Sequence, residues 1–206
     1  MAGEIGKRVL DISVSSILIV LLSPLMLIVA IAVKSSSSGP VFFRQNRIGR
    51  FGRPFRIFKF RTMLDDSEKM GQETAGATDA RITSVGQLLR KHKLDEFPQL
   101  LNVLTGDMSL VGPRPEIPFY AERYRGAERM VFSVRPGITD YSSLEFSNLE
   151  EIMDARGSLS PAEYYENVVH PRKKVLQMRY VREQSFFGDL QILFKTFMSL
   201  VFHTDK

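Results

Sequence analysis

An apolar segment near the N-terminus, from Val9 to Val33, limits what this chain can fold into more than any other feature. About 25 residues of helix would reach roughly 37 Å, which exceeds the roughly 30 Å hydrocarbon core of a bilayer. We therefore expect a membrane-embedded helix, although a buried helix of a soluble domain is an alternative. A cleavable signal peptide is disfavoured, because no small-residue cleavage site followed by a plausible mature start stands out.

Two details favour a re-entrant hairpin over a straight membrane span. Pro24 lacks an N–H group and clashes with the carbonyl of Val20, which predicts a kink or break where Ser23 can hydrogen-bond the freed carbonyl. Both flanks are basic, so the positive-inside rule would hold both ends in the cytoplasm. Each arm would be roughly 20 Å long, too short to cross. Residues 1–34 are therefore predicted to form a re-entrant helix–break–helix, with a kinked span as the alternative.

Composition limits the chemistry of the remainder, residues 35–206. The chain has 206 residues, 44% of them hydrophobic, which is enough for a small globular domain. It has no cysteine, which excludes thiolate chemistry, and its three histidines show no metal-ligand spacing, so a histidine-based zinc site is not expected. The net charge of +5 favours anionic partners such as acidic lipid or phosphorylated substrates. No nucleic-acid-binding motif is present, so nucleic acid is not expected to be a partner.

The remainder predicts an α-rich α+β domain with short strands. Phe55, Ile57 and Phe60 alternate with basic residues, as in a strand, and a helix is expected over residues 84–92. We expect a polar loop over residues 65–80 and small surface helices over residues 116–174. Pro136-Gly137 predicts a tight turn.

The last helix is expected to begin near Gly188, with Asp189 as its cap. Its apolar stripe consists of Phe187, Leu190, Phe194, Phe197 and Val201. The stripe fits a core helix or an amphipathic helix lying on the bilayer, and the sequence leaves both interpretations open.

The run from Leu94 to Glu116, LDEFPQLLNVLTGDMSLVGPRPE, carries the candidate chemistry. It opens on adjacent carboxylates, Asp95 and Glu96, and closes on Arg114 between two prolines. Between them lies a short helical pattern of apolar residues: Phe97, Leu100, Leu101 and Leu104. Pro98 suits a first helical turn, which places Asp95 near a helix N-terminus, where carboxylates and phosphates are favoured.

These residue types suit phosphoryl transfer. An aspartate is ionised at neutral pH and can attack phosphorus directly. Mg²⁺ held by Glu96, with Asp95 as a second ligand, would offset the repulsion between anions. The candidate phosphate-binding residues are Arg114, Lys59, Arg61 and Arg90. The alternatives are that Asp95 and Glu96 merely cap a helix, and that Asp107 is a turn residue rather than a further metal-side carboxylate.

Several blocks together resemble the bacterial sugar transferase family, the monotopic polyprenyl-phosphate phosphoglycosyl transferases. They are GPVFFRQNRIGRFGRPFRIFKFRTM, DARITSVGQLLRKHKLDEFPQLLNVLTGDMSLVGPRPE, RPGIT and YVREQSFFGDLQILFKTF. The resemblance covers nearly the whole chain and its central block is long. The compact length resembles the smallest members, and among these the chain looks most like those transferring diacetylbacillosamine 1-phosphate in protein glycosylation. Ala80 and Asp140 depart from the common pattern, and the second departure puts the identity of the sugar in doubt.

The resemblance implies a monotopic enzyme on the cytoplasmic face of the bacterial inner membrane, anchored by a re-entrant helix broken at Ser23-Pro24. Asp95 would attack the sugar-bearing phosphate of a UDP-sugar, releasing UMP and leaving a phosphosugar on the enzyme. Polyprenyl (undecaprenyl) phosphate would then take up this group, in the first membrane step of glycoconjugate assembly. Glu96 would bind Mg²⁺ and Arg114 would hold phosphate.

Two other functions remain to be separated from this one. In a direct ternary mechanism Asp95 would only activate the lipid phosphate. In the other, the chain would be a non-catalytic basic adaptor that binds an anionic phospholipid bilayer without depending on Asp95.

Overall fold

The computed structural model describes residues 2–64, 79–154 and 157–202; most of the polar loop predicted at 65–80 lies outside them. Its helices are α1 (Ala2–Ser36), α2 (Ser84–Lys91), α3 (Gln99–Thr105), α4 (Pro118–Ala121), α5 (Tyr141–Glu145), α6 (Leu149–Asp154), α7 (Pro161–Tyr164), α8 (His170–Glu183) and α9 (Phe186–Phe202). Short stretches of 3-10 helix are η1 (Arg50–Gly52), η3 (Leu94–Glu96) and η4 (Gly126–Ser133), and η5 (Tyr165–Val169) is a π-helical turn. The strands are β1 (Phe42–Ile48), β2 (Pro54–Phe60), β3 (Ser109–Val111) and β4 (Gly137–Thr139). The α-rich α+β class is confirmed.

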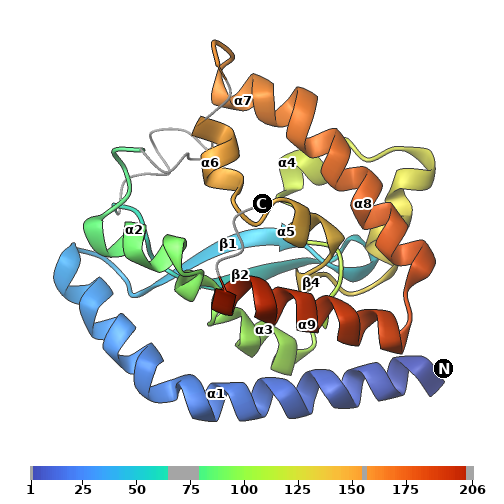
Figure 1. Ribbon diagram of the computed structural model, residues 1–206, viewed down its shortest axis with the longest axis horizontal. Coiled ribbons are helices and arrows are strands. Elements are labelled where there is room, and N and C mark those ends of the chain that lie inside the picture. The colour runs from blue at the N-terminus through green and yellow to red at the C-terminus, as the bar shows by residue number, and fades with distance from the viewer. Residues whose placement is uncertain (1, 65–78, 155–156, 203–206) are drawn as a thin grey trace.

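Helix α1 lies along one side of the molecule and bends part-way (Figure 1). The break predicted at Ser23-Pro24 is wrong, because one continuous helix runs through both residues. The Ser23 hydroxyl donates to the Val20 carbonyl at 2.8 Å, the carbonyl that Pro24 cannot hydrogen-bond. This bond satisfies the carbonyl, and the helix continues past Pro24. By length and composition, residues 4–36 could cross a membrane.

Both ends of α1 contact the globular domain. Near the N-terminus, the buried Asp11 accepts hydrogen bonds from the Leu110 backbone N–H and the Ser109 hydroxyl, at 2.9 and 3.0 Å. Near the C-terminus, Val29 and Val33 pack in a core cluster with Phe60 and Leu89. The outer face of α1 stays exposed along its length and is apolar.

Two small sheets form the scaffold of the domain. Strands β1 and β2 pair antiparallel, and β2 is the strand predicted around Ile57, while β3 and β4 pair in parallel. The tight turn predicted at Pro136-Gly137 is wrong, because Gly137 begins β4. A Cβ added to Gly137 would lie 2.1 Å from the backbone nitrogen of Gly112, so the parallel pair requires glycine at that contact. The main core cluster gathers between these sheets and helices α1, α3, α8 and α9.

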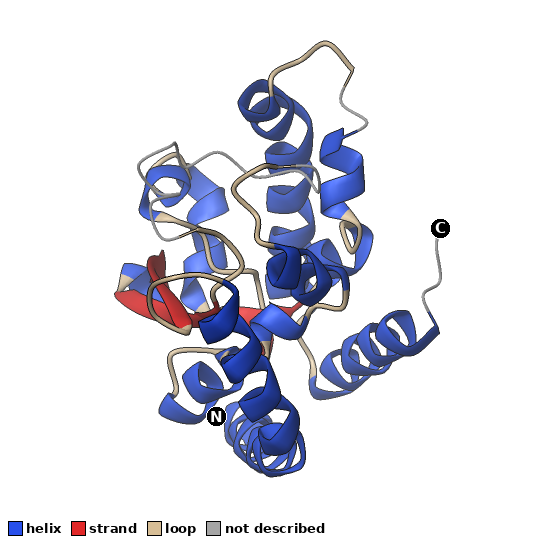
Figure 2. Ribbon diagram, turned by 90° about the vertical axis from the view of Figure 1, so that its left-hand side faces the viewer, coloured by secondary structure: helices blue, strands red, loops and turns tan. Residues whose placement is uncertain are grey.

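Helix α9 lies on the same side of the molecule as α1 (Figures 1 and 2). It begins at Phe186 and Ser185 caps it, accepting from the Gly188 backbone N–H at 3.1 Å; the cap predicted at Asp189 is wrong. Asp189 is instead buried and pairs with Lys7 of α1 at 2.5 Å. Phe187, Phe194 and Phe197 are at least 60% exposed, which argues against the core-helix interpretation.

Candidate functional site

Asp95 and Glu96 lie on η3, a single turn between α2 and α3. Lys93 turns the chain with a left-handed φ of 55°, and Pro98 occupies the position just before the first residue of α3. Asp95 therefore stands just before a helix N-terminus, as predicted. Asp95 is 7% exposed, so its carboxylate is largely removed from solvent.

Glu96 is held by two cations from other parts of the chain. Lys59 of β2 donates to its Oε1 at 2.7 Å, while the Arg114 guanidinium donates to both carboxylate oxygens, to Oε2 at 3.1 Å. Burial alone would raise the pKa of Glu96, but the charges of Arg114 and Lys59 outweigh it and hold that pKa well below its usual value. The same pairing raises the pKa of Arg114. Glu96 is therefore a fixed, ionised carboxylate.

Asp95 is in a different environment from its neighbour. Within the described residues its carboxylate receives no hydrogen bond, and its ion pair is with Lys59 at 3.7 Å. Burial raises the pKa of Asp95, while the charge of Lys59 and, more weakly, those of Arg90 and Arg114 oppose that rise. Two adjacent carboxylates thus differ: one is clamped, and the other keeps its oxygens available for a reaction.

The comparisons with known proteins bear on this site. The sequence model of the bacterial sugar transferase family matches residues 2–203. The chain belongs to the bacterial sugar transferase family.

Three relatives illustrate the range of this family. The chain is 40% identical over 92% of its length to a UDP-glucose:undecaprenyl-phosphate glucose-1-phosphate transferase of Klebsiella pneumoniae, covering 39% of that protein. It is 38% identical over 95% of its length to an Aeromonas hydrophila UDP-N-acetylgalactosamine-undecaprenyl-phosphate N-acetylgalactosaminephosphotransferase, covering 43% of it. A UDP-glucose:undecaprenyl-phosphate glucose-1-phosphate transferase of Caulobacter vibrioides is 38% identical over 98% of the chain, which covers 72% of it. The chain thus spans about two fifths of the length of the first two relatives. The resemblance to diacetylbacillosamine transferases stays a prediction.

In this family member, the two remaining predicted phosphate-binding residues, Arg90 and Arg61, differ in their surroundings. Arg90 of α2 donates to the Thr62 hydroxyl at 3.2 Å, and its charge helps to hold down the pKa of Asp95, so it lies by the site. Arg61 instead donates to backbone carbonyls of the linker after α1, those of Ser37 and Ser38. Its guanidinium is therefore occupied in fixing the end of α1, and its predicted phosphate contact stays the weakest of the four.

Asp107 lies in the turn after α3. It is exposed and accepts from the Thr105 hydroxyl at 2.8 Å, which fits the turn interpretation. In the part of the chain that the structure describes, no group of three or more histidine or acidic residues could hold a metal ion. The donor chemistry of Asp95 and Glu96 nevertheless fits Mg²⁺, which is often bound by one or two carboxylates together with substrate phosphates. Glu96 would have to give up part of its contact with Lys59 or Arg114.

A second polar cluster, which the sequence did not predict, lies beyond Arg114. It contains Arg47 of β1, Glu116, and His170 and Lys173 of α8. The last three are each 7% exposed or less. Glu116 ends the central motif. Arg47 lies far before it in the sequence and His170 and Lys173 lie far after it, so no local spacing pattern connects them.

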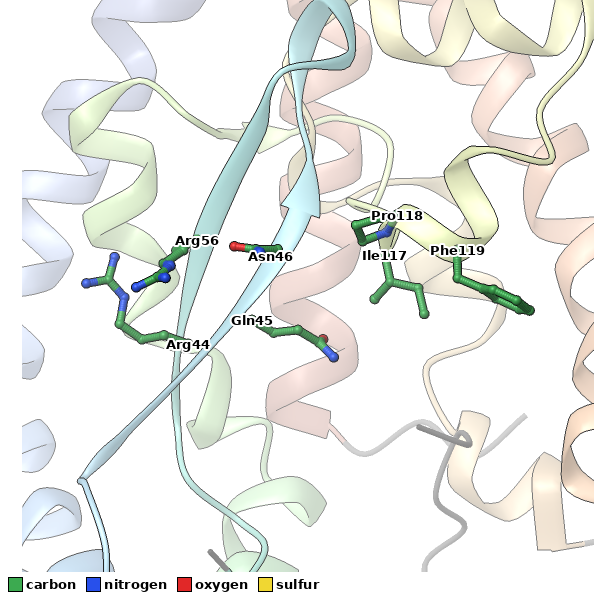
Figure 3. A pocket seen from close by; sticks show the side chains of 7 residues that line it. All are labelled: Arg44, Gln45, Asn46, Arg56, Ile117, Pro118 and Phe119. Atoms are coloured by element: carbon green, nitrogen blue, oxygen red, sulfur yellow. The ribbon is translucent and has the colours of Figure 1, made fainter. Parts of the chain in front are cut away.

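A surface groove of about 430 Å³ lies beside this cluster and is lined by Arg44, Gln45, Asn46, Arg56, Ile117, Pro118 and Phe119 (Figure 3). Gln45 accepts a hydrogen bond from Arg47 at 2.7 Å, which connects the groove to the cluster. None of the predicted site residues lines this groove.

Proposed function

We propose that this family member transfers a sugar 1-phosphate from a UDP-sugar to undecaprenyl phosphate and releases UMP. The names of the three relatives support the two substrates. The observation that carries the proposal is the asymmetric carboxylate pair: Asp95 accepts no hydrogen bond within the described chain, while Lys59 and Arg114 clamp Glu96 beside it.

In the first step, an oxygen of the Asp95 carboxylate attacks the phosphorus that bears the sugar. A bond from aspartate to phosphorus forms, and the anhydride bond to the nucleoside phosphate breaks. The electron pair leaves with UMP. Arg114, Lys59 and Arg90 stand where they would offset the repulsion between the carboxylate and the diphosphate.

In the second step, a phosphate oxygen of the lipid attacks the same phosphorus. The aspartyl bond breaks, the carboxylate of Asp95 is restored, and a polyprenyl diphosphate sugar leaves. One phosphoanhydride is exchanged for another, so no further energy source is required. Bound Mg²⁺, held by Glu96 with Asp95, would supply positive charge to the phosphate oxygens.

We also propose that the protein is monotopic, on the cytoplasmic face of the bacterial inner membrane. Both ends of α1 contact the same domain: Arg8 donates to the carbonyls of Val103 and Leu104, and Val33 packs against that domain at the other end. A helix crossing the bilayer would separate these ends, so the contacts favour the re-entrant alternative. The exposed apolar faces of α1 and α9 would lie in the lipid of an anionic bilayer.

Single-cysteine labelling tests this topology, since the chain has no native cysteine. We expect Glu4→Cys and Ser38→Cys, one at each end of α1 and both exposed, to react with an impermeant maleimide from the same side in oriented vesicles. A cysteine on the lumen-enclosed face of a known spanning helix serves as the control. Labelling of the two positions from opposite sides would show that α1 spans the membrane.

A panel of UDP-sugars tests the proposed reaction, with the protein in nanodiscs and undecaprenyl phosphate as acceptor. At least one sugar nucleotide, drawn from UDP-glucose, UDP-N-acetylgalactosamine and UDP-diacetylbacillosamine among others, should give UMP and a lipid-linked sugar diphosphate. The donor that does so identifies the sugar. Salt-sensitive binding to anionic vesicles with no UMP from any donor would favour the adaptor.

A further inference from the structure

Lys173 is a buried ammonium group without a direct polar partner. Its residue is 7% exposed, and in the described chain it makes no hydrogen bond and no ion pair. It lies over the rings of Tyr165 and Phe146, with 5.2 and 5.7 Å from Nζ to the ring centroids. A buried charge of this kind is costly unless it is paired, so its position calls for an explanation.

Two further buried nitrogen atoms belong to this cluster. The Nε2 atom of His170 and the Nε atom of Arg47 are buried and, among the described residues, have no hydrogen-bond partner. The carboxylate close to all three is that of Glu116, which accepts from the Tyr124 hydroxyl at 3.3 Å and whose charge acts on Arg47, His170 and Lys173. The two positive charges of Arg47 and Lys173 thus share the single carboxylate of Glu116, as in a site that an oxygen-rich anion completes.

Arg114 connects this cluster to the carboxylate pair. Its guanidinium donates to Glu96, while its backbone carbonyl accepts from Gln177 of α8, the helix that carries Lys173, at 3.3 Å. Its charge also acts on Asp95, Arg47 and Lys173. The cluster is thus one arginine away from the proposed nucleophile, on the far side of Glu96.

We propose that Lys173, His170 and Arg47 bind the phosphate that leaves with the nucleoside of the sugar-nucleotide donor. This rests on the proposed function, in which that phosphate gains negative charge as the anhydride bond breaks. Arg47 and Lys173 are cations already in place there and would stabilise the developing charge. Burial lowers the pKa of His170, so His170 would contribute as a neutral imidazole. The competing explanation is that Lys173 only balances Glu116 within the core.

Binding of UMP and of uridine, measured by calorimetry without divalent metal, tests the proposal. Lys173→Met should weaken UMP binding on the order of 10- to 100-fold and leave uridine binding unchanged. Lys173→Arg keeps the charge and should restore most of the affinity. The matched control is Lys174→Met on the same helix, since Lys174 pairs with Glu128 at 2.7 Å and should leave both affinities unchanged.

The pH dependence of the wild type provides a second measurement if Lys173→Met does not fold. Burial lowers the pKa of Lys173 to about 8, against the raising effect of Glu116; Arg114, Asp140 and Arg47 also face it. The ammonium is the binding form, so the preference for UMP over uridine should fall as pH rises above about 8. Lys173→Arg should lose that pH dependence, since an arginine stays protonated.

Unchanged UMP binding in a folded Lys173→Met protein would overturn the proposal, as would an equal loss of UMP and uridine binding or a UMP preference that stays flat to pH 9.5. Failure of the proposed reaction is a separate outcome. If no UDP-sugar is turned over but the Lys173 effect holds, the anion site stands without the reaction. If sugar phosphate is transferred but Lys173→Met binds UMP normally, only this inference fails.

Discussion

Replacing Asp95 by asparagine should reduce UMP release by on the order of 10³-fold or more, because the amide cannot form the bond to phosphorus. The fold should survive, since the Asp95 carboxylate accepts no hydrogen bond in the described chain and asparagine has the same shape. Removing a buried charge there should be close to neutral for stability, because burial raises the pKa of Asp95. Rates of UMP release at saturating UDP-sugar, with and without undecaprenyl phosphate, measure the effect.

Asp107→Asn is the control for this prediction. Asp107 is an exposed acidic residue of the same motif, and among the described residues it accepts only a local hydrogen bond from Thr105, so its variant should keep normal rates. Normal transfer by Asp95→Asn would rule out Asp95 as the nucleophile. The direct ternary mechanism would be indicated by a different result: transfer requires Asp95, UMP is released only when the lipid is present, and no phosphosugar is found on the protein.

Replacing Arg114 by methionine should affect both stability and activity. Glu96 would keep Lys59 but lose its bidentate partner inside a largely buried site. Breaking a fully buried ion pair costs about 3–5 kcal/mol. The Arg114 and Glu96 side chains are 32% and 16% exposed, so solvent screens part of the interaction and we expect about 1–3 kcal/mol. Thermal and denaturant unfolding in detergent would measure the loss.

The loss should also depend on pH. The pKa of Glu96 is lowered in the folded protein, so its ion pair stabilises the fold above the pKa of an unfolded glutamate and is lost as pH falls through the lowered value. The deficit of Arg114→Met should therefore be largest near neutral pH and shrink in acid. At neutral pH, Glu96→Gln combined with Arg114→Met should recover part of the stability but none of the activity. A double variant no more stable than Arg114→Met would show that Glu96 is not the relevant partner.

The sequence predicted the elements and residues that depend on local signals. The apolar pattern after Asp95 and the position of Pro98 located α3, and the alternation around Ile57 located β2, because helix and strand periodicity are written in neighbouring residues. The serine–proline pair predicted a distortion of α1, although not that the helix would continue through it. The candidate nucleophile and Arg114 lay within one motif and were found together.

Features that depend on contacts between residues far apart in the sequence could not be predicted from local patterns. The parallel pairing of β3 with β4 depends on close backbone contact at Gly112 and Gly137, whereas the Pro136-Gly137 dipeptide alone indicated a turn. Asp189 looked like a local cap, but it pairs with Lys7, 182 positions earlier in the chain. The cluster of Arg47, His170 and Lys173 likewise combines residues of β1 and α8, which are far apart in the sequence.

The covalent intermediate is tested by the intact mass of the wild-type protein after exposure to its UDP-sugar without lipid acceptor. We expect an increase equal to one sugar phosphate group, no more than one UMP released per protein, loss of the adduct on adding undecaprenyl phosphate, and no adduct in Asp95→Asn. Under acid quench, an unchanged mass in a preparation that transfers the sugar phosphate to lipid would contradict it.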